Sequence, residues 1–371
     1  TKGMNRGLVD DGAELKETVR LALENAEEYT GRGNLSGAYV GVTGQGISSR
    51  NVMNLALHKS EKEIITSSMI RQLIESCYPE NDSINDVLHV IPVGFNLDGY
   101  NKTRNPLGLH ARTVEVESHV VSMNSTDLRN TIKSVSSNKV MVNGAVFQGL
   151  AAAESVITGD EREIGSVLID IGESTTDLVV FKEGSPWYST VVPVGGNMIT
   201  RDISAALGVP FRAGEEIKVK YGHCMPSLVN SNEEIVVPGF QGDDKKTVLK
   251  RDIAVPIQSR MLEWLRLVTQ AISASGLRAI PSGGLVITGG GSRLSGLTEL
   301  INDNLDIPIR LAYPVGIKGL PSQLQKPEYS SAVGLLLWAV KHQGEKQSYP
   351  QENIWSQIKK ILNKKERAIV G

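Results

Sequence analysis

The chain has 371 residues, and its 39 lysines and arginines against 41 aspartates and glutamates give a formal net charge of −2. This balance argues against a nucleic-acid-binding protein, because phosphate binding needs a dominant positive field. Apolar residues make up 40% and charged residues 22%, which is typical of a globular protein and excludes a largely disordered one. We therefore expect no nucleic-acid partner, and the length favours two domains.

The chain has two cysteines, Cys77 and Cys224, and they form no CxxC pair. Two distant thiols predict neither a disulfide framework nor a structural zinc site, and they favour a reducing, cytosolic compartment. No apolar run reaches the ~18 residues that are needed to cross a bilayer.

Helical and strand patterns alternate along the chain, which predicts an α/β architecture. Apolar residues at helical spacing predict a helix over 11–29, and a glycine-containing stretch separates it from a strand at 38–42. Residues 44–117 are polar and turn-rich, and we expect them to form a small inserted α+β module. The further elements expected in this half are strands at 87–91 and 114–121, a helix at 126–136, a strand at 139–147, a helix at 149–157, and strands at 166–171 and 176–181.

The second half is richer in charge between residues 207 and 275, where a long amphipathic helix predicts a helical subdomain. The apolar side of this helix consists of Ile257, Met261, Trp264, Leu265, Val268 and Ile272. A strand at 285–288 then runs into three glycines and a helix at 297–305. Because glycine-containing strand ends occur in both halves, we expect two similar α/β domains that face each other across a cleft.

A tight turn with the sequence DIGESTTD, residues 170–177, joins two β-branched strands. Successive backbone N–H groups of such a turn can converge on an anion, and carboxylates at its edges can hold Mg²⁺ through water. On spacing alone, a surface hairpin whose polar residues satisfy the turn geometry is an equally good explanation. The turn residues predicted to bind phosphate are Gly172, Glu173, Ser174, Thr175 and Thr176.

A second candidate loop, LVITGGGS at 285–292, places Gly289, Gly290 and Gly291 between a strand and a helix. Glycines in this position allow the backbone to approach a flat base or sugar closely. Taken singly, a glycine triplet is more often a flexible connector.

Together, and in this order, the two loops resemble those of the actin-like ATPase superfamily. The turn at 170–177 resembles the second phosphate loop, whose usual form is Asp-x-Gly-Gly-Gly-Thr-x-Asp, and the glycine triplet resembles the adenosine loop. The resemblance implies ATP and Mg²⁺ as ligands. Asp170 is then expected to contact Mg²⁺ through water. Asp177 is expected to stabilise this arrangement from outside the direct ligands of the ion.

Two segments between these loops strengthen the resemblance. VPVGGNMITRDI at 192–203 matches the strand, the turn at Gly195 and Gly196, and the helix that follow the phosphate hairpin in the superfamily. Glu215 and Lys218 match a Glu-x-x-Lys helix whose side chains flank the adenine and ribose. Without this context, a solvated helical ion pair is the preferred explanation.

The resemblance also implies a role for Gln148, which aligns with the polar residue that orients the attacking water in actin and MreB. A glutamine positions water by hydrogen bonds but is a poor base, so at most a slow ATPase is expected. An ordinary amide at the end of a strand is an equally good explanation.

Further segments narrow the resemblance to the FtsA family of bacterial cell-division proteins. These are VLHVIP at 87–92 with NPLGL at 105–109, EEIKVKYG at 215–222, and YSSAVGL at 329–335. The inserted module resembles the family's subdomain IC, which separates FtsA from the rod-shape protein MreB and from sugar kinases. The pilus protein PilM shares this plan and is the nearest alternative.

The resemblance implies an actin-like (ribonuclease H-like), two-domain ATPase fold. Its expected parts are subdomain IA at 1–42 and 123–157, IC at 43–122, IIA at 158–205 and 277–329, IIB at 206–276, a return to IA at 330–342, a linker at 343–352 and a membrane-targeting helix at 353–371.

Two departures from the family pattern bear on nucleotide binding. Glu173 and Ser174 stand where the common pattern has glycine, and their side chains are expected to lower the affinity for an anion. Family members also begin with a glycine-containing β-hairpin, the first phosphate loop, ahead of the point that matches Thr1. We therefore expect an N-terminally incomplete chain whose hairpin is encoded upstream.

The last residues have the pattern of an interfacial membrane helix. Its apolar face holds Ile354, Trp355, Ile358, Ile361 and Leu362, and its flanks and far side hold Lys359, Lys360, Lys364, Lys365 and Arg367. Apolar residues of such a helix enter the headgroup boundary while the cations meet anionic lipid. A helix docked on its own domain is the alternative, which five cations around one tryptophan disfavour. The FtsA family has its membrane-targeting helix at this place.

The resemblance to the FtsA family, together with the pattern of the last residues, implies an ATP-binding cell-division protein that forms homopolymers and anchors the FtsZ ring to the cytoplasmic membrane at the division septum. It would be a peripheral protein of the divisome, bound to anionic lipids, that recruits later division proteins. The family resemblance implies that the C-terminal tail of FtsZ docks on subdomain IIB. The alternatives are a PilM-like pilus assembly protein, a nucleotide-dead scaffold and a sugar-kinase-type phosphotransferase.

Overall fold

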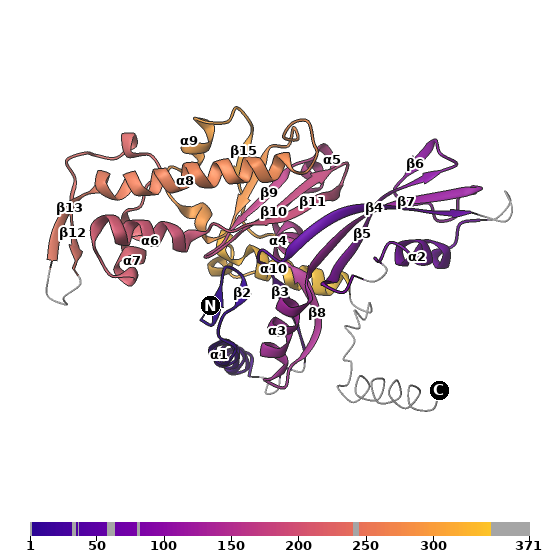
Figure 1. Ribbon diagram of the computed structural model, residues 1–371, viewed down its shortest axis with the longest axis horizontal. Coiled ribbons are helices and arrows are strands. Elements are labelled where there is room, and N and C mark those ends of the chain that lie inside the picture. Colours follow the sequence, from indigo (N-terminus) through magenta and orange to yellow (C-terminus); the bar gives the residue numbers. More distant parts are fainter. Residues whose placement is uncertain are drawn as a thin grey trace, which may run out of the picture.

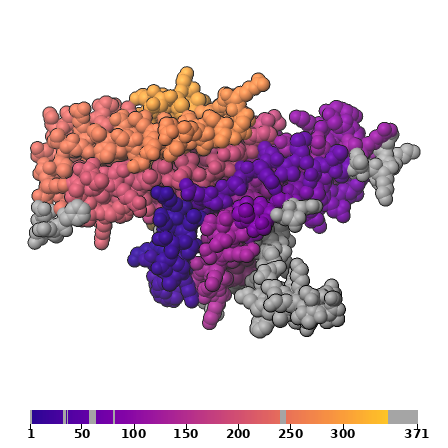
Figure 2. All heavy atoms as spheres, in the orientation of Figure 1, coloured from indigo at the N-terminus to yellow at the C-terminus, as the bar shows by residue number. Residues whose placement is uncertain are grey.

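The computed structural model describes residues 2–31, 35, 37–57, 64–79, 82–239 and 245–342 of the chain. The structure contains a five-stranded and a four-stranded sheet. The first lies at the centre, with a group of helices at one end of the molecule and the second sheet at the other (Figure 1). The N-terminal residues, coloured indigo, belong to a smaller lobe that lies below the central sheet (Figure 1) and projects from the lower side of the molecule (Figure 2). We call this part the first lobe, the five-stranded sheet with its helices the second lobe, and the four-stranded sheet the inserted module.

The second lobe is built on a sheet of order β11-β10-β9-β14-β15. Its strands are β9 (Val167–Ile171), β10 (Thr176–Lys182), β11 (Ser185–Val192), β14 (Leu285–Thr288) and β15 (Ile309–Leu311). β10 is antiparallel to both of its neighbours, whereas β14 is parallel to β9 and β15. Alternate residues point to opposite sides of a strand, so Val167 and Ile169 face one apolar core while Leu168 faces the other.

Helices cover the Val167 and Ile169 face of this sheet. They are α6 (Gly196–Leu207), α7 (Phe211–Tyr221), α8 (Lys250–Ser273) and α9 (Leu297–Asn302). All six residues of the predicted apolar side of α8 are buried, which confirms the amphipathic helix. A hairpin of β12 (Glu234–Pro238) and β13 (Lys245–Leu249) comes just before α8.

The first lobe contains a parallel pair of strands, β3 (Gly37–Val42) and β8 (Met141–Phe147). Its helices are α1 (Gly12–Thr30), α3 (Ser125–Ser136), α4 (Gln148–Val156) and α10 (Ser330–Lys341). α10 lies directly on α4, because Gly334 has no side chain to collide with the Ala151 carbonyl group. These two helices share an apolar core with the Leu168 face of the five-stranded sheet, which joins the two lobes.

The inserted module is a sheet of order β4-β7-β5-β6 with one helix. Its elements are β4 (Ile47–Leu57), α2 (Ser67–Glu75), β5 (Asn85–Leu97), β6 (Asn101–Thr103) and β7 (Thr113–Asn124). The strands expected at 87–91 and 114–121 are present and longer than predicted, whereas β4 and α2 were not foreseen. Pro92 lies inside β5 beside an irregularity in the pairing between Pro92 and Gly94, which accommodates its missing N–H group.

The remaining described elements are short. They are a hairpin of β1 (Met4–Asn5) and β2 (Leu8–Val9), the helix α5 (Gly159–Ile164), and four 3₁₀ turns, η1 (Pro226–Leu228), η2 (Gly290–Arg293), η3 (Ser322–Leu324) and η4 (Pro327–Tyr329). Within the described ranges, none of the helices combines the length and the apolar character that a bilayer span requires. The linker expected at 343–352 and the helix expected at 353–371, with all of its predicted membrane residues, lie outside the described residues.

Candidate functional site

The predicted phosphate turn is the connection between β9 and β10, and it rests on the first turn of α6. The N–H group of Gly172 donates to the Thr175 carbonyl group at 2.9 Å, which closes the turn. The carbonyl groups of Gly172 and Glu173 accept hydrogen bonds from the N–H groups of Gly196 and Asn197, at 3.0 and 2.7 Å. Backbone donors that a helix start leaves without a partner are thus used to hold the turn in place.

Gly195 is the N-cap of α6 and makes this close approach possible. A Cβ atom at this position would lie 2.7 Å from the Glu173 carbonyl oxygen and 2.7 Å from the Ser174 nitrogen. The prediction of a glycine turn next to the phosphate hairpin is therefore supported by a steric reason.

Asp170 and Asp177 lie opposite each other on the paired strands β9 and β10. Strand alternation places both side chains on the face of the sheet that is turned toward the first lobe, and both are buried. The Ser331 hydroxyl group donates to Asp170 Oδ2 at 2.5 Å, and the Thr43 hydroxyl group donates to Asp177 Oδ1. A surface hairpin would leave its polar side chains in water, so the burial of both aspartates argues against that alternative.

The two carboxyl groups hold protons more tightly than isolated aspartates do. Burial raises the pKa of Asp170 to about 6, although the hydrogen bond from Ser331 opposes part of this effect. Burial, followed by repulsion from the Asp170 carboxylate, raises the pKa of Asp177 well above its ordinary value. A divalent cation at the turn would favour ionisation of the pair, because its charge opposes both effects.

The glycine triplet follows β14, whose neighbour in the sheet is β9. Gly289 has a φ of +84°, and a Cβ atom there would collide with Asp170 Oδ1. Gly291 is packed in the same way against the Ile171 side chain, whereas Gly290 has more space. Gly290 and Gly291 belong to η2, so this segment is an ordered turn next to Asp170 and not a loose connector.

Glu215 and Lys218 lie on α7, and they connect this helix to the start of α6. Lys218 Nζ lies 2.7 Å from Glu215 Oε2 and donates to the Gly196 carbonyl group at 3.0 Å and to Thr200 Oγ1 at 2.9 Å. The Lys218 side chain is 13% exposed and the Glu215 side chain 42%, so the lysine is withdrawn from solvent while the glutamate is partly solvated. A cation beside a helix N-terminus creates a positive potential at the phosphate turn.

Gln148 is the first residue of α4, directly after β8, and its Nε2 atom lies 3.4 Å from the Gly41 carbonyl oxygen. Because Val42 of β3 pairs with Phe147 of β8, Gln148 and Thr43 lie at the same edge of the parallel pair. This is the carboxyl edge, where ligands bind in sheets of this type. Thr43 at this edge contacts Thr175 and Asp177, so the edge that carries Gln148 faces the β9–β10 turn.

Sequence reasoning missed Thr43 and Ser331, two first-lobe residues that donate hydrogen bonds to the aspartates. Thr43 had a usable signal, because a polar residue directly after a predicted strand lies at that strand's carboxyl edge. Ser331 had none, since its position beside Asp170 depends on the packing of α10 against the second lobe.

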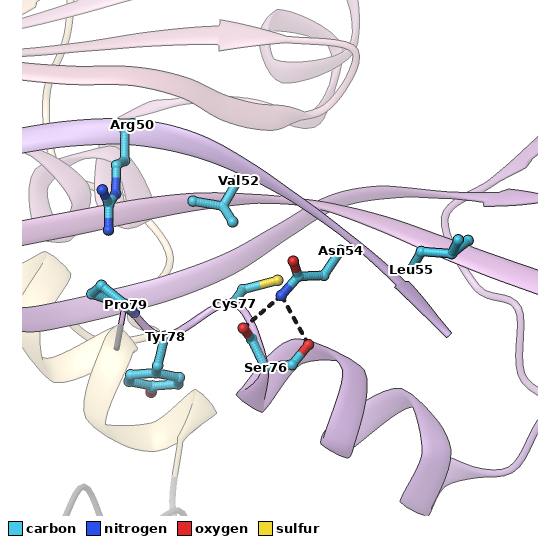
Figure 3. Close-up of a pocket in the computed structure, with 8 residues that line it drawn as sticks. All are labelled: Arg50, Val52, Asn54, Leu55, Ser76, Cys77, Tyr78 and Pro79. Carbon is cyan, nitrogen blue, oxygen red and sulfur yellow. Dashed lines mark hydrogen bonds between the residues drawn. The ribbon is translucent and has the colours of Figure 1, made fainter. Parts of the chain in front are cut away.

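Two cavities of the structure lie away from the turn. One measures about 590 Å³ and lies between β4 and the end of α2, lined by Arg50, Val52, Asn54, Leu55, Ser76, Cys77, Tyr78 and Pro79 (Figure 3). The other measures about 210 Å³ and lies between α4, α10 and the β10–β11 turn. The candidate site is therefore assigned from its chemistry and not from cavity size.

The donor set around the turn suits a cation that is bound mostly through water. Among the described residues, no group of three or more histidine, cysteine, aspartate or glutamate side chains could hold a metal ion directly. Mg²⁺ commonly keeps several waters and takes only one or two carboxylates together with substrate phosphates. Asp170 and Asp177 fit that pattern.

Two family models match the chain. Residues 167–334 match the family described as cell division protein FtsA, and residues 44–122 match the SHS2 domain inserted in FtsA. The cell division protein FtsA of Pseudomonas aeruginosa is 30% identical over 345 residues, which cover 93% of this chain and 82% of that protein. FtsA of Escherichia coli (strain K12) is 31% identical over 346 residues, which cover 91% of this chain and 81% of that protein.

A solved structure supports the fold independently. The chain resembles a protein of the PilM–PilN type IV pilus biogenesis complex, with a TM-score of 0.62 over 91% of this chain and 88% of that one. The sequence identity is 17%, so this likeness bears on the fold alone. It confirms the predicted actin-like fold with two lobes and an inserted module.

Proposed function

Because the chain belongs to the FtsA family of cell division proteins, we propose that it binds ATP with Mg²⁺ and uses this binding to assemble and anchor division filaments. The observation that carries the nucleotide site is the pair Asp170 and Asp177, buried side by side at the base of the β9–β10 turn. Burying two ionised carboxyl groups costs free energy unless a partner of opposite charge compensates them. A hydrated Mg²⁺ ion is such a partner.

The roles of the surrounding residues follow from their positions. The turn from Gly172 to Thr176 is proposed to bind phosphate, and Gly195 and Gly196 keep α6 close behind it. Glu215 and Lys218 on one side, and the turn from Gly289 to Gly291 on the other, are proposed to enclose the adenosine. Gln148 is proposed to position a water molecule, which would support slow hydrolysis at most.

Binding of a fluorescent ATP analogue in the presence of Mg²⁺ tests this site. Asp170→Asn is expected to weaken binding at least tenfold, because the neutral amide loses the attraction for hydrated Mg²⁺. Asp303→Asn is a matched control, since Asp303 is an exposed aspartate at the end of α9. Unchanged affinity in Asp170→Asn would discredit the assigned site.

A nucleotide-dead scaffold is the second candidate, and Glu173 favours it. Its carboxylate lies at the turn, 3.2 Å from Asn197 Nδ2, where it adds negative charge close to the proposed phosphate position. If the wild-type chain binds no ATP analogue at millimolar concentration while it still assembles, the scaffold function is the correct one.

We further propose that the subdomains divide the division functions as the family resemblance implies. Residues 206–276, subdomain IIB, would receive the C-terminal tail of FtsZ. This is supported by large apolar side chains that this region leaves in water, among them Val219, Leu228 and Val236, which are 76%, 60% and 62% exposed. Subdomain IC, residues 43–122, would take part in polymerisation and in the recruitment of later division proteins.

The membrane function rests on the sequence of residues 353–371, which combines one apolar face with flanking lysines. Co-sedimentation with vesicles that contain anionic lipid, with and without these residues, tests it. The complete chain is expected to sediment and the shortened chain to stay in solution. Equal binding of the two chains would remove the anchoring role.

A further inference from the structure

Two hydroxyl groups of the first lobe reach across to the two carboxyl groups of the second lobe. Thr43 follows β3 and donates to Asp177 Oδ1, and its Oγ1 atom also lies 3.5 Å from Thr175 Oγ1 in the phosphate turn. Ser331 lies in the first turn of α10 and donates to Asp170 Oδ2 at 2.5 Å. Both carboxyl groups of the turn are thus held from the same side, by residues of the other lobe.

These contacts differ from the neighbouring contacts between the lobes because their acceptors are ionisable, whereas the hydroxyl contact between Ser330 and Thr288 is neutral. The shared core there is apolar, with Phe147 and Leu150 of the first lobe packed with Val179 of the second. Apolar contacts respond little to a change of charge nearby, whereas a hydrogen bond to a carboxyl group changes with the charge and orientation of that group. The two hydroxyl contacts are therefore well suited to sense an ion at the turn.

We propose that Thr43 and Ser331 are positioning residues through which nucleotide occupancy of the β9–β10 turn changes the placement of the first lobe relative to the second. The inference rests on the proposed nucleotide site and extends it to the coupling between the lobes. A ligand shifts a conformational equilibrium only if it interacts differently with the two states. Thr43 and Ser331 each hydrogen-bond one oxygen of the carboxyl groups that would hold a hydrated Mg²⁺ ion, so binding of the ion would change the charge and orientation of their acceptors and supply that difference.

The proposal implies a defined change in the hydrogen bonds between the lobes. If the carboxylate oxygens turned toward a bound cation, the hydrogen bonds from Thr43 and Ser331 would lengthen or be replaced. The end of β3 and the start of α10 would then lose their contacts with the two carboxyl groups together, while the neutral contact of Ser330 with Thr288 would remain. Because packed interfaces have discrete arrangements and do not deform continuously, such a local change can produce a rotation of one lobe.

The test uses the complete chain with spin labels on two exposed residues, one in each lobe. Lys16→Cys on α1 and Arg251→Cys on α8 carry the labels. The distance between the two spin labels is measured by pulsed electron paramagnetic resonance without and with MgATP. The labelled chain is expected to change its distance distribution on addition of MgATP. In the added double variant Thr43→Val, Ser331→Ala, the shift is expected to fall by at least half, while MgATP affinity changes less than tenfold.

Two sets of variants separate coupling from a general loss of structure. Thr43→Ser and Ser331→Thr keep the hydroxyl groups and are expected to keep the shift. Thr131→Val and Ser134→Ala are matched controls, because these buried α3 residues donate only to carbonyl groups of their own helix. They are expected to leave the shift unchanged.

The outcomes distinguish this inference from the function on which it rests. A double variant that binds MgATP and shows the full shift would overturn the coupling role and leave the nucleotide site intact. A double variant that no longer binds MgATP would also overturn it, since the hydroxyl groups would then belong to the binding site itself. A wild-type chain that binds no MgATP would remove the proposed function, and this inference with it.

Discussion

Two strand ends with nearly the same sequence lie in the two lobes and have different partners. β3 runs into Val42-Thr43-Gly44 and β14 ends in Thr288 before Gly289, and each strand is paired in parallel with a later strand of its lobe. The Thr288 hydroxyl group donates to the Ala312 carbonyl group at 3.0 Å and lies 2.6 Å from the Ser330 hydroxyl group, so both of its partners are neutral. The Thr43 hydroxyl group meets the carboxyl group of Asp177.

The difference comes from the neighbouring strands. β14 has β9 beside it, and β9 continues through the phosphate turn into β10. Asp170 of β9 and Asp177 of β10 both face the first lobe. In the part of the chain that the structure describes, β3 pairs with β8 alone. The same local sequence therefore acquires a structural role in one lobe and a contact with the candidate site in the other, according to what packs against it.

The largest expected effect is at the glycine that follows β14. Gly289→Ala places a Cβ atom against Asp170 at a φ of +84°, and is expected to lower the free energy of unfolding by more than about 3 kcal/mol. Urea denaturation measures this. Gly290→Ala is the matched control, because the nearest atom to its Cβ would lie 3.7 Å away. Equal losses in the two variants would contradict the packing described for this turn.

The pH dependence of stability distinguishes the ionisable carboxyl group of Asp170 from the neutral groups that surround Thr288. Burial raises the folded pKa of Asp170 from 3.8 to about 6, so its contribution to stability is present below about pH 4 and is lost as the pH rises to about 6. Asp170→Asn removes this loss. The free energy of unfolding of the variant, relative to wild type, is expected to rise by about 3 kcal/mol between pH 4 and pH 7.

Denaturation at several pH values checks the expected rise, with Asp303→Asn as the control that should leave the difference flat. Burial lowers the pKa of His89 to about 3 and of His119 to about 4, and these residues add a slope of the opposite sign. That slope is common to wild type and variant, so it cancels in the difference. A flat difference for Asp170→Asn would show that its pKa is not raised.

Thr288→Val tests the neutral strand end. The variant leaves the Ala312 carbonyl group and the Ser330 hydroxyl group short of a buried partner, and is expected to cost about 2 kcal/mol of unfolding free energy. MgATP affinity is expected to stay within threefold of wild type, and Thr288→Ser is expected to restore stability. If Thr288→Val suppressed the MgATP-dependent change between the lobes as strongly as Thr43→Val, the two strand ends would not differ in function.

The smallest expected effect is at the contact between the inserted module and the second lobe. Ser49 of β4 donates to the Ser189 carbonyl group at 2.8 Å and accepts from the Ser189 N–H group at 2.9 Å. Ser49→Ala is expected to cost about 1 kcal/mol in thermal or urea denaturation. Ser48→Ala, on an exposed neighbouring residue, is expected to be neutral. A larger loss for Ser48→Ala would contradict the contact.

Local patterns were sufficient for much of the fold. The apolar spacing of α8, the buried strand β9 and the turn at 172–175 were predictable, because each depends on residues within one element or on two adjacent strands. β4 and α2 were not foreseen, although α2 is amphipathic, because both lie in a stretch whose overall composition is polar and turn-rich. β4 is held by its long pairing with β7, which comes more than fifty residues later in the chain.

Some residues of the candidate site could likewise be predicted from local sequence, and others could not. The sequence alone determined the hairpin with Asp170 and Asp177 and the glycines that allow the close turns, because strand alternation and backbone conformation are local properties. The tertiary structure decided that both aspartates are buried against the other lobe, and that Thr43 and Ser331 are the residues that meet them. Burial and hydrogen-bond partners depend on which distant segments pack together, and no local pattern records that choice.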